Sequence, residues 1–140
     1  MSRVKELFLF DILVAICKIE HTVKIFKDAE ELKYNYMAWD SVVREFEIIG
    51  EATKNLIESE LLDNSKSQIV NFRNVLIHEY FGIDEEEVFD IATNKLSDLK
   101  QTIILKIAVI ETELKQELMV DFRDENKHLN FIVNALEDLK

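Results

Sequence analysis

The segment spanning residues 71–84 carries the side chains best suited to acid–base and phosphate chemistry. Arg73 and His78 lie five residues apart in it. Asn74 follows the arginine directly, and Tyr80 lies two residues beyond the histidine. A histidine can donate or accept a proton near neutral pH, and a guanidinium can hold phosphate oxygens and stabilise charge that develops on them. Such groups suit metal-independent cleavage of RNA, in which the ribose 2′-hydroxyl is the internal nucleophile.

Helical geometry separates these side chains. A helix turns about 100° per residue, so Asn74 and His78 share a face whereas Arg73 and His78 diverge by about 140°. For both side chains to act on one atom, one of three arrangements is needed. Either the arginine side chain wraps around the helix, or the helix end distorts at His78, or two copies of the chain combine their residues. Without further support, an arginine and a histidine at this spacing more often make surface or capping contacts, so this alternative stays open.

No cluster of metal ligands is visible in the sequence. His21 and His128 have no carboxylate partner at ligand spacing, so we expect ordinary surface or boundary histidines. The run Glu85–Glu87 is expected to complement the positive end of a helix that Asp84 caps. Cys17, the single cysteine, lies in an apolar helical stretch and is expected to be a buried core residue. We therefore expect no disulfide, no metal and no cofactor.

Composition favours one small helical domain. The chain has 140 residues, no proline and two glycines, which argues against β-sandwiches, β-barrels and glycine-rich phosphate loops. Its 17 basic and 28 acidic residues give a net charge of −11, which argues against a broad nucleic-acid-binding surface. No apolar stretch reaches the roughly 18 residues of a membrane span, so we expect a cytoplasmic protein without a membrane partner.

Apolar periodicity predicts an all-α antiparallel bundle of four to six helices. The expected helices cover residues 4–27, 34–62 and 65–80, a stretch from 85 to about 110 that breaks near 97–98, and a last short helix around 129–139 that follows a polar interval at 121–127. Gly50 lies inside the second helix and is expected to permit close approach of another helix. Gly82 is expected to end the third helix.

Three blocks of this sequence together resemble the HEPN-domain family, and within it the HepT-like group of toxins. The first block is Arg73-Asn74, an apolar spacer, His78, one further residue and Tyr80, continued by Phe-Gly-Ile-Asp at 81–84. The other two blocks are residues 43–54, which end in Ile-Ile-Gly-Glu-Ala-Thr-Lys, and residues 88–100. The resemblance covers about residues 5–115. It departs from the family pattern at Asn71, at Glu45, and at residues 65–68, which lack the usual proline and tryptophan.

The resemblance implies a helical bundle that forms a homodimer and acts as a metal-independent ribonuclease. By position, Arg73 and His78 are then catalytic, Asn74 is supporting, and Tyr80 is a modification site. HepT-like toxins pair with a nucleotidyltransferase-type antitoxin that transfers AMP to the motif tyrosine. An added nucleotide would fill the cleft and bring negative charge to the place of the substrate phosphate. We thus expect a HEPN-like bundle over 1–117 and, over 118–140, an extra helix packed on the bundle or at a dimer interface.

Two other functions compete with an RNA endonuclease toxin. The chain could be a non-catalytic helical partner of a nucleotidyltransferase, which its acidic surface favours. It could also be a structural dimer in which the motif only packs. Glu51 has two readings as well: it could orient Arg73, or it could be solvated. We favour a solvated Glu51 and a purely structural Gly50.

Overall fold

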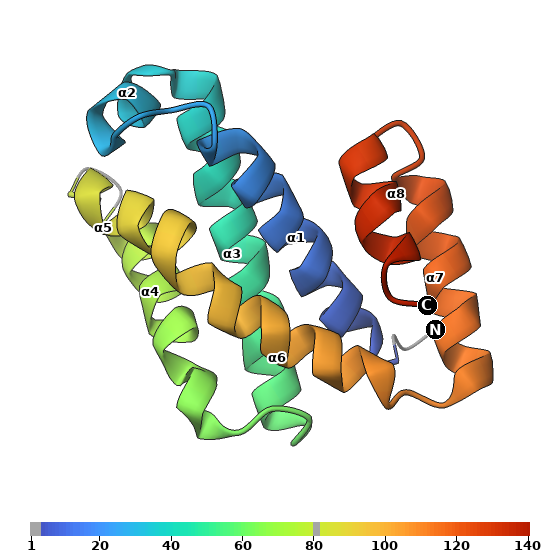
Figure 1. The fold of residues 1–140 in the computed structure, drawn as a ribbon. Coiled ribbons are helices and arrows are strands. Elements are labelled where there is room, and N and C mark those ends of the chain that lie inside the picture. The colour runs from blue at the N-terminus through green and yellow to red at the C-terminus, as the bar shows by residue number, and fades with distance from the viewer. Residues whose placement is uncertain (1–3, 80–81) are drawn as a thin grey trace.

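The computed structural model describes residues 4–79 and 82–140, which form helices joined by short connections (Figure 1). The α-helices are α1 (Leu7–Val23), α2 (Ala29–Tyr34), α3 (Tyr36–Glu58), α4 (Ser67–His78), α5 (Glu85–Asp90), α6 (Leu96–Ala108), α7 (Thr112–Glu125) and α8 (Asn130–Glu137). A 3₁₀ turn, η1 (Asn64–Lys66), precedes α4, and a π-helical turn, η2 (Ile91–Lys95), joins α5 to α6. No strand occurs in these two ranges, and the predicted all-α fold class is confirmed.

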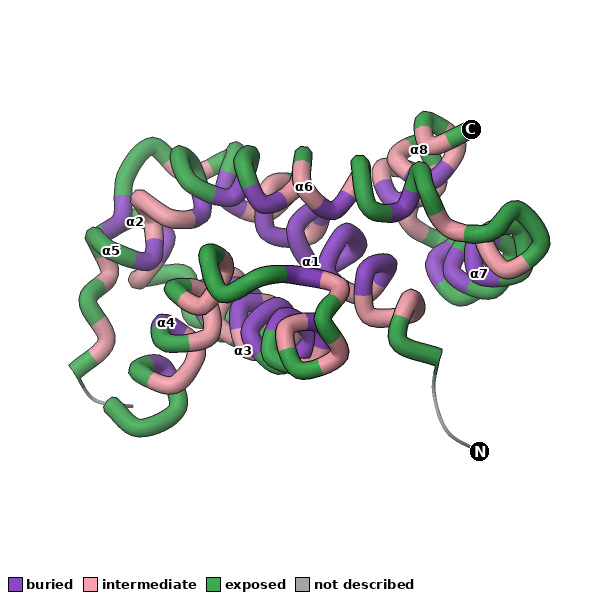
Figure 2. The backbone as a smooth tube through the Cα atoms, turned by 90° about the horizontal axis from the view of Figure 1, so that it is seen from below, coloured by how far each residue is buried: buried purple, intermediate pink, exposed green. Residues whose placement is uncertain are grey.

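The central helix of the bundle is α1. Its side chains are apolar on nearly every face, and Phe10, Ile12, Ile16 and Ile19 are fully buried. A helix that is apolar all round must be covered on all sides. Here α3 lies on one side of α1, α7 and α8 lie on the other, and α6 crosses α1 (Figure 1). The buried positions accordingly concentrate along α1 in the middle of the molecule (Figure 2).

Capping side chains explain where several helices begin. The Asp28 carboxylate accepts a hydrogen bond from the Glu31 N–H and starts α2. Asp84 accepts from the first turn of α5, as expected. Asn35 was not foreseen as a cap. Its side chain accepts from the Ala38 N–H at 3.1 Å while its backbone is extended. The single helix predicted over 34–62 is therefore wrong at both ends, because Asn35 separates α2 from α3 and α3 stops at Glu58.

Other boundaries also differ from the sequence-based expectations. The third helix begins with a 3₁₀ turn and its α-helical part ends at His78; the connection to Gly82 includes residues outside the described ranges. The break expected at 97–98 lies earlier, as the π-helical turn η2, which is continuous with the helices around it and so leaves the apolar pattern without a gap. The polar interval at 121–127 is largely helical, because α7 continues to Glu125.

The two last helices share the core of the bundle. Phe122 of α7 stacks on Phe10 of α1 with ring centroids 5.3 Å apart. Leu118, Ile132 and Leu136 are buried in the same hydrophobic cluster. The boundary expected between 117 and 118 lies inside α7, whose buried side chains pack together with those of α1 and α8.

Cys17 is buried on α1 as predicted, and that burial raises the pKa of its thiol. Within residues 4–79 and 82–140, no helix is both long and apolar enough to cross a bilayer.

Candidate active site around Arg73

Apolar contacts with α3 orient α4 and thereby place the motif side chains. Phe72 and Leu76 are buried, and the Phe72 ring meets the Phe46 ring of α3 edge-on at 5.2 Å between centroids. Because successive helical residues are about 100° apart, this orientation puts Arg73 on one flank of the contact with α3. It puts His78 on the outward side, where the side chain is exposed.

The guanidinium of Arg73 is held by two partners. Its Nη2 lies 2.9 Å from Oε2 of Glu51 on α3, and its Nη1 donates to Oδ1 of Asn74, also at 2.9 Å. The Arg73 side chain is only 23% exposed. Its Nε is buried and has no hydrogen-bond partner among the described residues. The arginine head group is therefore fixed before any ligand arrives.

Gly50 supplies the space for this arrangement. A Cβ atom added to Gly50 would overlap the Arg73 Cβ and would lie 2.6 Å from its Cγ. Only glycine lets the stem of Arg73 lie across α3 at this point. The expected close approach at Gly50 is thus confirmed, but the group that approaches is a candidate catalytic side chain as well as a neighbouring helix.

Arg73 borders a pocket of about 430 Å³ between α1, α3 and α4. Arg44 and Arg73 contribute two guanidinium groups, and Asp11, Glu47 and Glu51 contribute three carboxylates. Arg44 is 3.4 Å from Glu47, one helical turn along α3. The remaining lining residues are Phe8, Ile48, Ala52 and Ile77. Two guanidinium groups that line the same open pocket can bind an anionic group such as a phosphate.

The structure brings Arg73 and Asn74 together but not Arg73 and His78. His78 is the last residue of α4, and the residues that line the pocket of Arg73 do not include it. This agrees with the divergence of about 140° that helical geometry predicts. Tyr80, the expected modification site, lies outside the described residues.

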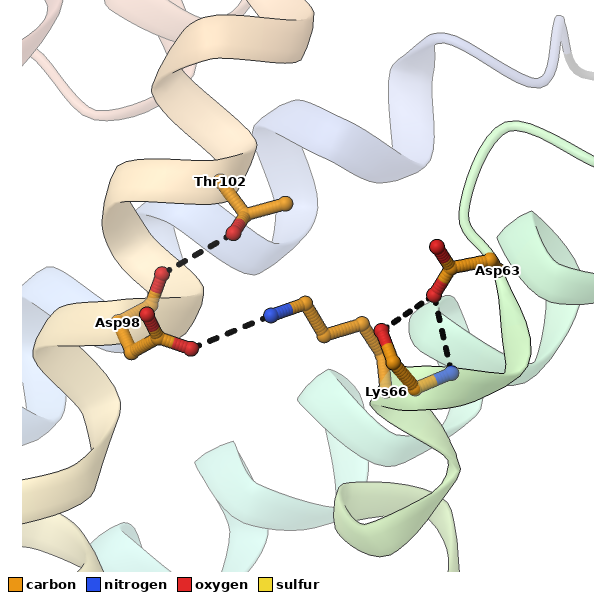
Figure 3. Close-up of polar contacts among 5 residues, drawn as sticks. Asp63, Lys66, Asp98 and Thr102 are labelled. Carbon is orange, nitrogen blue, oxygen red and sulfur yellow. Dashed lines mark hydrogen bonds and ion pairs between the residues drawn. The ribbon is translucent and has the colours of Figure 1, made fainter.

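A second groove, of about 440 Å³, borders the opposite flank of α4 and was not anticipated from the sequence. Asn71, Phe72 and Val75 of α4 face Ile91, Leu96 and Leu99 of η2 and α6 across it. Lys66 Nζ reaches Asp98 of α6 at 3.2 Å, while Asp63 accepts hydrogen bonds from Ser65 beside it (Figure 3). This polar link ties the start of α4 to α6 at the edge of the groove.

Two side-chain expectations are settled by these contacts. Glu51 is exposed, as the preferred reading has it, but its carboxylate also pairs with Arg73. The sequence contains the Gly50-Glu51 pair, but only the packing of α4 on α3 shows that Glu51 contacts Arg73. The ring of His21 stacks in parallel on Phe131 at 3.9 Å, and His128 is exposed. Among the described residues, no group of three or more histidine, cysteine or acidic side chains could hold a metal ion.

Comparison with known proteins assigns the chain to a family. The model of the ribonuclease HepT-like family matches residues 12–105, well over half of the chain. The chain therefore belongs to the HepT-like ribonuclease family, as its three motif blocks indicate.

Its curated relatives include several archaeal proteins of Methanocaldococcus jannaschii. "Putative RNase MJ1380" is 35% identical over 106 residues, which cover 73% of this chain and 95% of that protein. "Putative RNase MJ0127" is 42% identical over 67 residues, which cover 44% of this chain and about half (54%) of the relative. "Gamma-glutamylcyclotransferase and putative RNase MJ0434" is 28% identical over 142 residues, 99% of this chain and 58% of that protein. No solved structure matches the chain significantly.

Proposed function

We propose that this protein is a metal-independent endoribonuclease in which Arg73 and His78 are catalytic and Asn74 is supporting. The observation that carries the proposal is the guanidinium of Arg73, fixed by Glu51 and Asn74 beside an open pocket. Membership of the HepT-like ribonuclease family supports it. So do the names of the relatives.

The proposed reaction needs only groups that the chain and the RNA supply. His78 removes the proton from a ribose 2′-hydroxyl, whose oxygen attacks the adjacent phosphorus. The bond from phosphorus to the 5′-oxygen breaks, leaving a 2′,3′-cyclic phosphate, and the departing 5′-oxygen takes up the proton that the histidine received, which restores the neutral imidazole. Arg73 binds a non-bridging phosphate oxygen and stabilises the charge that grows on it.

A homodimer completes this site in our proposal. The pocket of Arg73 is not lined by the His78 of the same chain. A second copy packed near α4 would bring its own exposed His78 toward the first copy's arginine. The dimer is expected from the family resemblance, and the divergent directions of the two side chains on one helix give it a physical reason.

We further propose that the ribonuclease is the toxin of a toxin–antitoxin pair. Its partner would be a nucleotidyltransferase-type antitoxin that transfers AMP to Tyr80. Tyr80 lies two residues beyond His78, so a nucleotide attached there would place negative charge close to the reacting phosphate. RNA cleavage would then be blocked by both bulk and charge.

Cleavage of RNA in the presence of a chelator tests the enzymatic part. The wild-type protein is expected to cleave, and His78→Ala and Arg73→Ala are each expected to lose about 100-fold or more of the rate. His128→Ala is the matched control, because it removes a histidine that is also exposed but lies outside the motif. Equal background cleavage by the wild type and His78→Ala would overturn the proposal and would favour a non-catalytic module.

Intact-mass measurement tests the modification. After co-expression with a neighbouring nucleotidyltransferase, the chain is expected to gain one or more AMP units, located on Tyr80 by digestion. Tyr80→Phe should stay unmodified and remain active when co-expressed. AMP on another residue, or an unmodified wild-type chain that is silenced all the same, would contradict this part.

A further inference from the structure

Glu51 lies in the block of residues 43–54, apart from the block that contains Arg73 and His78. We propose that Glu51 is a positioning residue, whose carboxylate fixes the guanidinium of Arg73 beside the pocket in the orientation that phosphate binding needs. This inference rests on the proposed ribonuclease function and assigns a role in it to a residue of α3. Glu51 acts through Arg73 and is not itself required to touch the RNA.

The hydrogen-bond inventory of Arg73 supports this role. A guanidinium has five N–H donors. Glu51 forms an ion pair with Nη2, Asn74 accepts a hydrogen bond from Nη1, and the Nε–H is buried without a partner among the described residues. The two terminal nitrogens carry more N–H groups than these two partners occupy, and guanidinium N–H groups match the oxygens of a phosphate. Glu51 and Asn74 thus hold the guanidinium and leave donors on it for a ligand.

Two acceptors from different helices also limit rotation of the side chain. Asn74 moves with α4, but Glu51 is anchored on α3, so the arginine spans the packed contact between the helices. With Gly50 accommodating the stem, the side chain has few alternative rotamers. Without Glu51 the head group would keep only its neighbour Asn74, and a small displacement at a reacting phosphate is enough to cost much of the rate.

The carboxylate of Glu51 has a second effect, of opposite sign. It places a negative charge on the wall of the pocket, where it opposes binding of RNA. A glutamine at 51 keeps an oxygen acceptor for Arg73 and removes that charge. Positioning and repulsion can therefore be separated by comparing Glu51→Gln with Glu51→Ala.

Glu47 is the matched control for Glu51. It lies one turn earlier on α3 and lines the same pocket, yet it pairs with Arg44 and not with Arg73. Glu47→Ala removes the same charge from the same wall and leaves the partners of Arg73 in place. Effects that Glu51→Ala and Glu47→Ala share report on charge, and effects confined to Glu51→Ala report on positioning.

Steady-state cleavage of a single-stranded RNA by the full-length chain is the first measurement. Glu51→Ala is expected to lower kcat at least about tenfold, because it leaves the arginine misplaced. Glu51→Gln is expected to keep kcat within about threefold of the wild type and to lower KM, because an amide oxygen still accepts the hydrogen bond without the repelling charge. A kcat for Glu51→Ala equal to that of the wild type would overturn the proposal. So would a kcat for Glu51→Gln as low as that of Glu51→Ala.

A second measurement reads the arginine without using activity. The buried Nε–H of Arg73 can be followed in ¹⁵N–¹H NMR spectra, assigned by its loss in Arg73→Lys. Its exchange with water is expected to quicken about tenfold in Glu51→Ala and to stay unchanged in Glu47→Ala, since a hydrogen bond to a charged group contributes on that order. If the wild type cleaves no RNA, the proposed function fails, while this exchange rate still decides whether Glu51 fixes Arg73. Unchanged exchange in Glu51→Ala would overturn the positioning role.

Discussion

At the scale of single residues, Gly50 has little freedom to change, because Arg73 occupies the space that a Cβ would need. In Gly50→Ala, the new methyl group overlaps the stem of Arg73. We expect the free energy of unfolding to fall by about 1–3 kcal/mol, as overpacking usually costs, with only part offset by the roughly 1 kcal/mol that alanine gains in a helix. Gly82→Ala is the control, because a Cβ there would meet only a carbonyl oxygen at 4.0 Å. Urea unfolding of the two variants measures the difference, and equal midpoints would contradict the close approach.

Glu45 gives a prediction about pH. Burial raises the pKa of this carboxyl above its ordinary value of 4.5, although Lys18 and Arg44 act in the opposite direction. The folded state therefore favours the protonated acid and loses stability as pH rises through the raised pKa. Glu45→Gln carries no such charge, so it is expected to melt at a higher temperature than the wild type at pH 7. The advantage should shrink as pH is lowered through the raised pKa and should be largely lost below 4.5. A constant difference from pH 4 to pH 7 would contradict this account.

At the scale of helices, the sequence was most informative where a side chain caps a helix or buries a face. Asp84 was recognisable as a cap, and apolar periodicity predicted a helix over residues 4–27, where α1 lies. Asn35 was missed because apolar residues continue on both sides of it. The π-helical turn η2 was missed because one extra residue in a turn shifts the apolar pattern without interrupting it.

The attachment of α7 and α8 can be tested through Phe122. Its ring is buried against Phe10 of the central helix, so Phe122→Ala is expected to lower the free energy of unfolding by about 3–5 kcal/mol. Val120→Ala, on the same helix but 63% exposed, should change it by no more than about 0.5 kcal/mol. Circular dichroism and thiol accessibility should report one coincident transition in both variants. Two separate transitions would show that the last two helices unfold independently.

The candidate site shows a different limit of sequence reasoning. The divergence of Arg73 from His78 follows from helical geometry alone. The pair between Glu51 and Arg73 does not, because it depends on how far α4 is shifted along α3, and that register is set by the contact of Phe46 with Phe72. Residues 22 positions apart in the sequence become partners only through this packing.

At the scale of the whole molecule, the net charge of −11 constrains how RNA could bind. The pocket of Arg73 offers two guanidinium groups, Arg44 and Arg73, on an otherwise acidic body. Neutralising two phosphates of a single strand gives a slope of about −1.4 for log K against log salt, and a dimer that uses two pockets gives about −2.8. The slope can be measured by fluorescence anisotropy of labelled RNA with His78→Ala from about 50 to 300 mM salt, and it should lie between roughly these two values. A slope steeper than about −5 would indicate an extended basic surface instead.

Because Cys17 is buried, its reaction with a thiol reagent reports how the helical bundle opens. The chain has one thiol, it is 7% exposed on the central helix, and burial raises its pKa. Thiolate is the reactive form, so a thiol reagent meets both a steric and an ionisation barrier in the closed molecule. Labelling should therefore track how often α1 is uncovered, and no engineered probe is needed to follow it. Binding of RNA, of a second copy or of an antitoxin would each register as protection of this one sulfur atom, provided that the ligand favours the closed bundle.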